Sequence, residues 1–212
     1  MRKIKRFKIT PRQKEILRRL LRGGGLLRQA GFTTELEVTQ YILEGFSTLN
    51  PGVVYAFNQD AHWELDSDNT VHKEMFTACA VTLGTRLEEW VEKAHQTAPA
   101  RYIVAGTIAF EFLKSAISFV TDLIAEQAQK EEYETLPVQF VYLPPFGVTA
   151  PPKLLREAAR LEQTLSGKIL PAILEKLNAP KVDIAPDGQG LTPFYTAVFL
   201  VPWQKVRKKG KK

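Results

Sequence analysis

The sequence predicts a single α+β domain in which helices flank a mostly antiparallel, twisted sheet. Short runs rich in β-branched and aromatic residues, which are typical of strands, are interspersed with capped amphipathic runs, which are typical of helices. No internal repeat or low-complexity linker divides the 212 residues, a length that suffices for one well-filled core. We therefore expect one domain over residues 9–204.

The first quarter of the chain predicts two helices followed by a strand. Thr10 before a proline resembles a capped helix start, and the glycines at 23–25 would end that helix. A second helix is expected from Thr34, where Glu37 completes a capping box. The β-branched and aromatic run at 53–57 predicts a strand. The positions expected to be buried on the second helix are Leu36, Tyr41, Ile42 and Phe46.

The middle of the chain predicts an apolar strand that leads through a glycine turn into two helices. The strand covers 76–81, and Gly84 marks the turn. Thr85 with Glu88 resembles another capping box at the start of the third helix. A longer helix is expected from 101 to about 130, with Ile108, Phe112, Ile117 or Ala116, Phe119, Val120 and Leu123 on its buried side.

The remaining elements follow from turn residues and short apolar runs. The residues at 62–72 predict a hairpin around a polar turn, and 183–190 predicts a loop. Strands are expected at 136–142 and 194–201, and helices from 151 and at 169–177.

Positive charge is concentrated at the two ends of the chain. The net charge is +6, and residues 1–22 carry ten Lys and Arg against one Glu, while 205–212 carry six against none. We expect basic tails at 1–8 and 205–212, and these would be solvated ends or would bind a polyanion. The residues between them carry a net negative charge.

Composition indicates a cytoplasmic protein without a membrane span. No run of about 18 uncharged apolar residues is present. The basic start is not followed by the apolar segment of a secretory signal. Cys79 is the only cysteine, which is compatible with a reducing compartment.

The residues that carry most catalytic and metal chemistry are not arranged for it. His62, His72 and His95 lack the close ligand spacing of a zinc site. Cys79 lies in an apolar strand between two alanines, which favours a packing role over a nucleophilic one. We therefore expect no catalytic residue and no metal ligand.

A ligand-binding loop is the best candidate for a site. The loop at 142–147 joins aromatic rings to fixed proline backbone directly after a strand, an arrangement that presents a flat apolar surface to a planar ligand. A tight connection whose aromatic rings cap the core fits the same residues. The expected ligand-binding residues are Tyr142, Pro145, Phe146 and Gly147 of this loop, with Tyr195 of the last strand.

The order of these elements resembles the activation domain of cobalamin-dependent methionine synthase and its stand-alone relatives. The resemblance runs from about residue 9 to 203. The stretch from Ala80 through Gly84 to Glu88, followed by the long helix, carries most of it. The other pieces lie at 15–20, 37–42, 50–55, 177–179 and 191–198.

The resemblance implies a domain that binds S-adenosylmethionine and assists the reduction and remethylation of a corrinoid. It further implies an accessory protein whose partner is a corrinoid protein or methyltransferase, with cobalamin carried by that partner. The family's ligand signature is an Arg followed by Gly-Tyr on a loop after a strand. Here the loop has no arginine, and Pro145, Phe146 and Gly147 replace the pair. The two-pronged contact of an Arg with the ligand carboxylate is therefore missing.

Two other functions fit the sequence. A nucleic-acid-binding or assembly protein would use the basic ends, although these lack the interleaved aromatic residues that stack on bases. A structural subunit of a larger complex would need neither the loop nor the tails.

Overall fold

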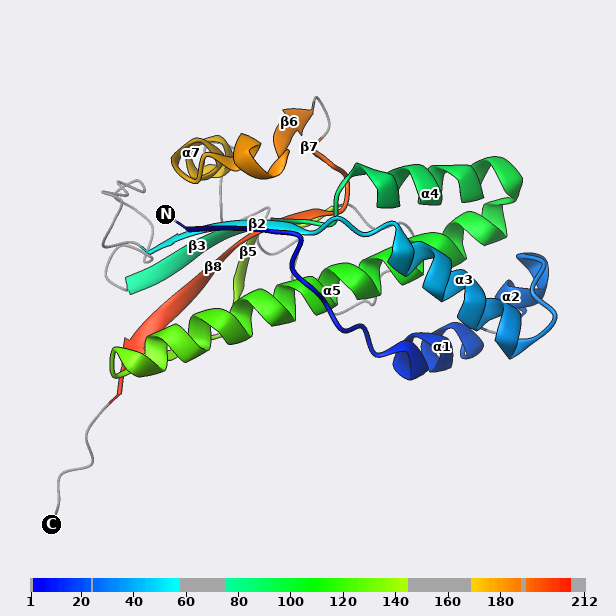
Figure 1. Ribbon diagram of the computed structural model, residues 1–212, viewed down its shortest axis with the longest axis horizontal. Coiled ribbons are helices and arrows are strands. Elements are labelled where there is room, and N and C mark those ends of the chain that lie inside the picture. Colours follow the sequence, from blue (N-terminus) through cyan, green and yellow to red (C-terminus); the bar gives the residue numbers. More distant parts are fainter. Residues whose placement is uncertain (1, 24, 58–74, 145–168, 188–189, 207–212) are drawn as a thin grey trace, which may run out of the picture.

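The computed structural model describes residues 2–23, 25–57, 75–144, 169–187 and 190–206, and confirms a mixed α+β fold with an antiparallel sheet (Figure 1). Within these residues the main sheet has six strands in the order β1-β2-β3-β8-β4, and β5 also pairs with β8. All of these pairs are antiparallel. The strands are β1 (Arg2–Lys5), β2 (Gly52–Phe57), β3 (Met75–Thr82), β4 (Tyr133–Thr135), β5 (Gln139–Tyr142) and β8 (Thr196–Lys205).

Helices cover both faces of this sheet. The long helix α5 runs along one face, with α1, α2 and α3 gathered beside one end of it, and α7 lies on the opposite face (Figure 1). A small hairpin of β6 (Ala185–Asp187) and β7 (Gly190–Thr192) joins the α7 layer. The helices are α1 (Gln13–Leu21), α2 (Leu26–Gln29), α3 (Glu35–Ser47), α4 (Thr85–Thr97), α5 (Pro99–Lys130), α7 (Ile169–Lys176) and the 3-10 helix η3 (Ala179–Val182).

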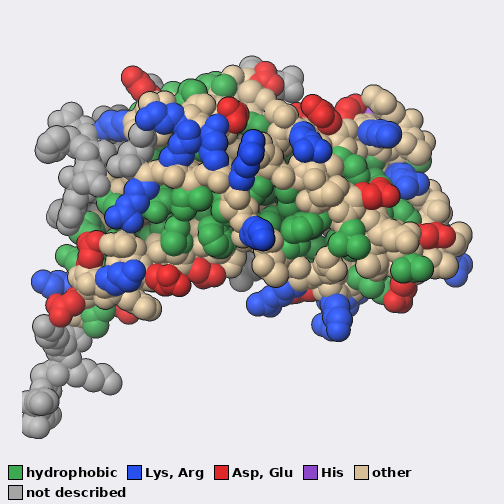
Figure 2. Space-filling model, viewed as in Figure 1, with side chains coloured by type: hydrophobic (Ala, Val, Ile, Leu, Met, Phe, Trp, Pro, Cys, Tyr) green, Lys and Arg blue, Asp and Glu red, His purple; other side chains and the backbone are tan. Residues whose placement is uncertain are grey.

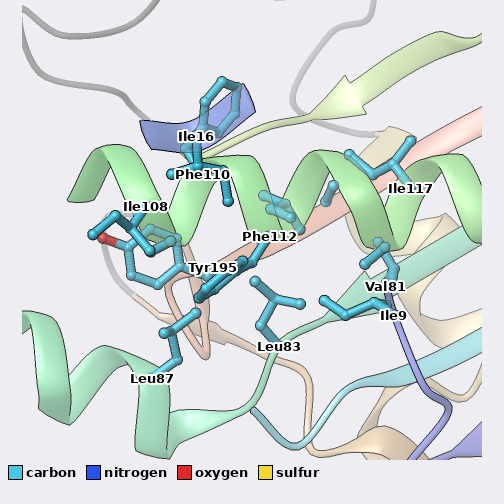
Figure 3. Close-up of a cluster of buried hydrophobic side chains, with 14 of the residues drawn as sticks. Ile9, Ile16, Val81, Leu83, Leu87, Ile108, Phe110, Phe112, Ile117 and Tyr195 are labelled. Atoms are coloured by element: carbon cyan, nitrogen blue, oxygen red, sulfur yellow. The ribbon is translucent and has the colours of Figure 1, made fainter. Parts of the chain in front are cut away.

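Alternation along the central strands produces two separate cores. Successive side chains of a strand point to opposite faces of the sheet. Cys79 and Val81 therefore join the core under α5, whereas Ala78 and Ala80 join the core under α7. Figure 3 shows the first core, in which side chains from the N-terminal segment, β3, α4 and α5 converge, together with Tyr195. Because both faces are buried, the buried positions of these strands are mostly apolar, with Thr77, Thr82 and Thr196 as the polar exceptions.

The expected N-terminal tail is instead part of the sheet. Residues Arg2–Lys5 form β1 and pair with β2, with Lys5 opposite Gly52. Phe7 and Ile9, which follow, are buried in the α5-side core. Exposed cations alternate here with buried apolar residues. The high charge of the segment made it resemble a solvated tail in the sequence. At the other end, Lys205 is the last residue of β8, and residues 207–212 lie outside the described part.

Helix starts were predicted with mixed success. The capping box of α3 is confirmed, because Thr34 Oγ1 accepts a hydrogen bond from the Glu37 amide at 3.2 Å and the Glu37 carboxylate accepts one from the Thr34 amide at 3.4 Å. The predicted cap at Thr10 is wrong, since α1 begins at Gln13 after Arg12. The connection before α1 is not helical, and its apolar residues Phe7 and Ile9 are buried in the core, so tertiary packing overrides the local signal.

Other differences follow from burial. Leu36 was expected to be buried on α3 but is 67% exposed, and Val38 is buried in its place. Phe119 of α5 lies at the surface, where it stacks on Phe7 with ring centroids 4.9 Å apart. Helix α2, strand β4 and the β6–β7 hairpin were not predicted. The hairpin expected at 62–72 and the helix expected from 151 lie outside the described residues.

One helix in the described part of the chain, α5, is long and apolar enough to cross a membrane by length and composition. Its most apolar 18-residue window is 61% buried. The buried side includes Ile108, Phe112 and Val120, which pack against the sheet and its neighbouring helices. This is the pattern of a core helix.

The turn at Gly84 directs the chain from β3 into α4. Gly84 has φ 85°, a conformation that residues with a side chain rarely adopt. Its amide donates to Thr82 Oγ1 at 3.2 Å. A Cβ atom here would lie 3.0 Å from the carbonyl oxygen of Asn50, so there is also no space for one. Only glycine satisfies both constraints.

The variant Gly84→Ala should therefore lower the free energy of unfolding by about 2 kcal/mol, because it combines left-handed backbone with a steric clash. Gly25→Ala is the matched control, since Gly25 has φ −72° and only the end of Gln29 at 4.0 Å from an added Cβ. Denaturant unfolding of both variants measures the difference. Equal stability of the two variants would show that the turn is not constrained as described.

Candidate functional site

Tyr142 is fixed to the β6–β7 hairpin. It is the last residue of β5, is half-buried, and belongs to the core under α7. Its hydroxyl accepts a hydrogen bond from the Leu191 amide at 3.2 Å. A Cβ atom on Gly190 would lie 2.6 Å from the same hydroxyl, so the ring closes over that glycine. Burial raises the pKa of Tyr142, which keeps the phenol neutral. Tyr142 therefore positions β7.

Tyr195 lies in the other core. It is 4% exposed and packs under α5, with its ring edge against Phe194. Its carbonyl oxygen accepts a hydrogen bond from the Leu83 amide at 3.1 Å. Burial raises the pKa of its phenol far above the usual range, with smaller contributions from Tyr102 and Glu88.

The sheet separates these two tyrosines. Tyr142 pairs with Val198 and shares its face under α7, whereas Tyr195 contacts the core on the α5 side. The structure does not bring them together around one cavity. Pro145, Phe146 and Gly147, the other expected ligand-binding residues, lie outside the described residues.

An open groove lies between α4 and the end of β7. Its volume is ≈ 730 Å³, and Glu88, Glu89, Glu92, Lys93 and Thr192 are among its lining residues. We call it the acidic groove, because its lining residues include three carboxylates and only one ammonium group. Leu191, the residue next to Thr192, is the hydrogen-bond partner of Tyr142, so β7 connects the groove to the first residue of the expected ligand loop.

A hydrogen bond beside the groove joins α4 to the chain between β7 and β8. Glu88 Oε2 accepts a hydrogen bond from the Phe194 amide at 3.0 Å. The expected capping box of Thr85 with Glu88 is thus wrong, because Gly84 is the N-cap of α4 and Glu88 turns toward the chain between β7 and β8. The carboxylates Glu89 and Glu92 remain exposed on α4. They give this edge of the molecule a negative potential.

An ion-pair network centred on the buried carboxylate of Glu111 joins α5 to α1. Glu111 is 8% exposed although its helix neighbours are apolar. Its carboxylate forms ion pairs with Arg19 of α1 and with Lys114, whose Nζ atom is 3.0 Å from Oε2. Burial lowers the pKa of Lys114, and the nearby charge of Arg19 lowers it further. This network was not predicted from the sequence. The signal that could have revealed it is Glu111 itself, a single glutamate between two phenylalanines in an apolar helical run.

In the part of the chain that the structure describes, the residue types that bind metals do not form a cluster. Within the described ranges no group of three or more His, Cys, Asp or Glu side chains is placed to hold a metal ion. Cys79 is buried, and burial raises the pKa of its thiol well above the usual value. A thiol in that state is a weak nucleophile. His62 and His72 lie outside the described residues.

No protein-family model matches this chain, and a comparison with curated proteins finds no match. The resemblance to the methionine synthase activation domain therefore stays a prediction.

If Tyr142 positions β7, Tyr142→Phe should lower the free energy of unfolding by about 1 kcal/mol, because the Leu191 amide loses its acceptor. Hydrogen exchange of the Leu191 amide should also accelerate. Tyr102→Phe is the control, since that ring is 40% exposed. Unchanged exchange at Leu191 would contradict the positioning role.

Loss of the Glu111 carboxylate should destabilise the contact of α1 with α5. Glu111→Gln should lower the free energy of unfolding by about 2 kcal/mol, because Arg19 and Lys114 would both lose their ion-pair partner and would keep only the more exposed Glu15 nearby. Glu126→Gln removes an exposed carboxylate from the same helix and serves as control. Thermal unfolding of the two variants measures the effect, and a difference of less than about 0.5 kcal/mol would mean that the network contributes little.

Proposed function

We propose that the protein is a binding protein with the activation-domain fold, which takes S-adenosylmethionine in the acidic groove and assists the reductive reactivation of a partner corrinoid protein. It would supply binding and orientation, while the cofactor on the partner carries the chemistry. The observation that carries this proposal is the excess of carboxylates over ammonium groups in the groove between α4 and β7.

Charge complementarity favours this ligand. S-adenosylmethionine carries a sulfonium and an ammonium group against one carboxylate, so it is a net cation. The exposed carboxylates Glu89 and Glu92 attract such a ligand, and Lys93 on the same helix is placed to pair with its carboxylate. The lysine would take over part of the role of the arginine that the family signature has and this loop lacks.

The volume and position of the groove agree with the proposal. At ≈ 730 Å³ it falls within the usual range for small-molecule sites. One of its walls is α4, the first helix of the stretch that carries most of the sequence resemblance. In the structure these residues form β3, Gly84, α4 and α5, and β3 is a central strand of the sheet.

Calorimetric titration tests ligand binding. The full chain should release or absorb heat with S-adenosylmethionine, and should bind S-adenosylhomocysteine more weakly because that product has no sulfonium charge. Glu89→Gln combined with Glu92→Gln should raise the dissociation constant roughly fivefold. Glu126→Gln, on the exposed side of α5, should leave it unchanged.

Visible absorbance tests the corrinoid part of the proposal. Addition of a cobalamin-loaded methyltransferase together with S-adenosylmethionine should change the cobalamin spectrum under reducing conditions only when this protein is present. Absence of heat at millimolar S-adenosylmethionine would overturn the ligand assignment. Heat without any spectral change would overturn the corrinoid partner.

A further inference from the structure

The segment between β1 and α1 alternates cations with buried apolar residues. Phe7 and Ile9 point into the core, and the intervening Lys8 and the preceding Arg6 are exposed. The core contacts of Phe7 and Ile9 therefore hold these cations on the outer side.

A second groove lies between this segment and the start of α4. Its volume is ≈ 610 Å³, and its cations are Arg6, Lys8 and Arg86. Asn50 adds an amide, and Phe46 and Leu49 add apolar surface. No acidic side chain lines this groove among the described residues, and within that part of the chain none of its three cations has an ion-pair partner. We call it the basic groove.

The backbone around the basic groove is held in place. Arg6 has φ 57°, a left-handed conformation that costs a non-glycine residue roughly 1–2 kcal/mol. Its amide donates to the Pro51 carbonyl at 2.7 Å, and the Asn50 amide donates to the Leu83 carbonyl at 3.0 Å. These bonds join the N-terminal segment and the turn before α4 to the same short loop. Strained backbone of this kind is concentrated at binding sites.

We propose that the basic groove binds the phosphate groups of a phosphate ester. Three cations that share one groove repel each other, and a dianionic phosphate replaces that repulsion with charge-assisted hydrogen bonds. The guanidinium groups of Arg6 and Arg86 are suited to two-pronged contacts with phosphate oxygens. The side-chain amide of Asn50 adds a neutral donor. Phe46 and Leu49 form a surface for an apolar part of the ester.

The phosphate has two possible sources. The groove volume matches a small molecule such as a nucleotide. Figure 2 shows further Lys and Arg side chains in a row between β1 and the α7 layer, which would extend the contact for a single-stranded nucleic acid. In both cases the binding residues belong to the folded domain, and the site does not depend on the basic segment at 205–212.

Binding to the full chain tests the proposal, with inorganic pyrophosphate and a 12-nucleotide oligothymidylate as probes. At low ionic strength at least one probe should bind, and Lys8→Gln or Arg86→Gln should each raise its dissociation constant about tenfold. Arg28→Gln and Lys130→Gln remove exposed cations outside the groove and should leave it unchanged. Thermal unfolding confirms that all four variants keep the fold.

The two probes distinguish the sources. Binding of pyrophosphate supports a small phosphate ester, and binding of oligothymidylate alone supports nucleic acid. The proposal is overturned if neither probe binds, or if Lys8→Gln and Arg86→Gln bind as the controls do. Because the acidic groove is lined by other residues, these results are independent of the S-adenosylmethionine titration.

Discussion

The pairing of β3 with β8 is the constraint on which the rest of the structure depends. Eight consecutive residue pairs join these strands, from Met75 opposite Trp203 to Thr82 opposite Thr196. Both faces of the pair are buried, so a slip of one residue would move each core side chain to the wrong face. The register thus determines which residues face α5 and which face α7. It also fixes the turn at Gly84, from which α4 begins, and the chain between β7 and β8, and so it positions α4 and Thr192, which line the acidic groove.

Helix α4 carries positive and negative side chains on different sides. Its first turn places Arg86 at the basic groove, and later turns place Glu89 and Glu92 in the acidic groove. An amphipathic helix with Leu87, Val91 and Ala94 inward leaves its outer faces free to carry opposite charges on different sides. Two grooves of opposite charge therefore lie on different sides of one helix. The overall net charge of +6 conceals this separation.

Local patterns predicted the elements that tertiary packing does not override. The α3 capping box was read correctly because Thr34 and Glu37 contact each other within one turn. The N-terminal strand was missed because its partner, β2, is about fifty residues away and its cations resembled a tail. Tyr142 and Tyr195 lie on different faces of the sheet because of the strand register. Which residues pair across a sheet cannot be inferred from one sequence alone, so this separation was not predicted. The acidic groove was not predicted, because its lining comes from α4 and from β7, which are far apart in the sequence. In the sequence its carboxylates look like those of any exposed helix face.

We propose that α4 and the chain from Thr192 to Phe194, which the Glu88 hydrogen bond joins, form one ligand-binding unit. Backbone amide chemical shifts recorded during a titration with S-adenosylmethionine test it most directly. We predict that the largest shifts occur at residues 85–96 and 192–194, since these residues surround the groove and share the Glu88 hydrogen bond. Shifts confined to other parts of the chain, or no shifts at saturating ligand, would contradict the account.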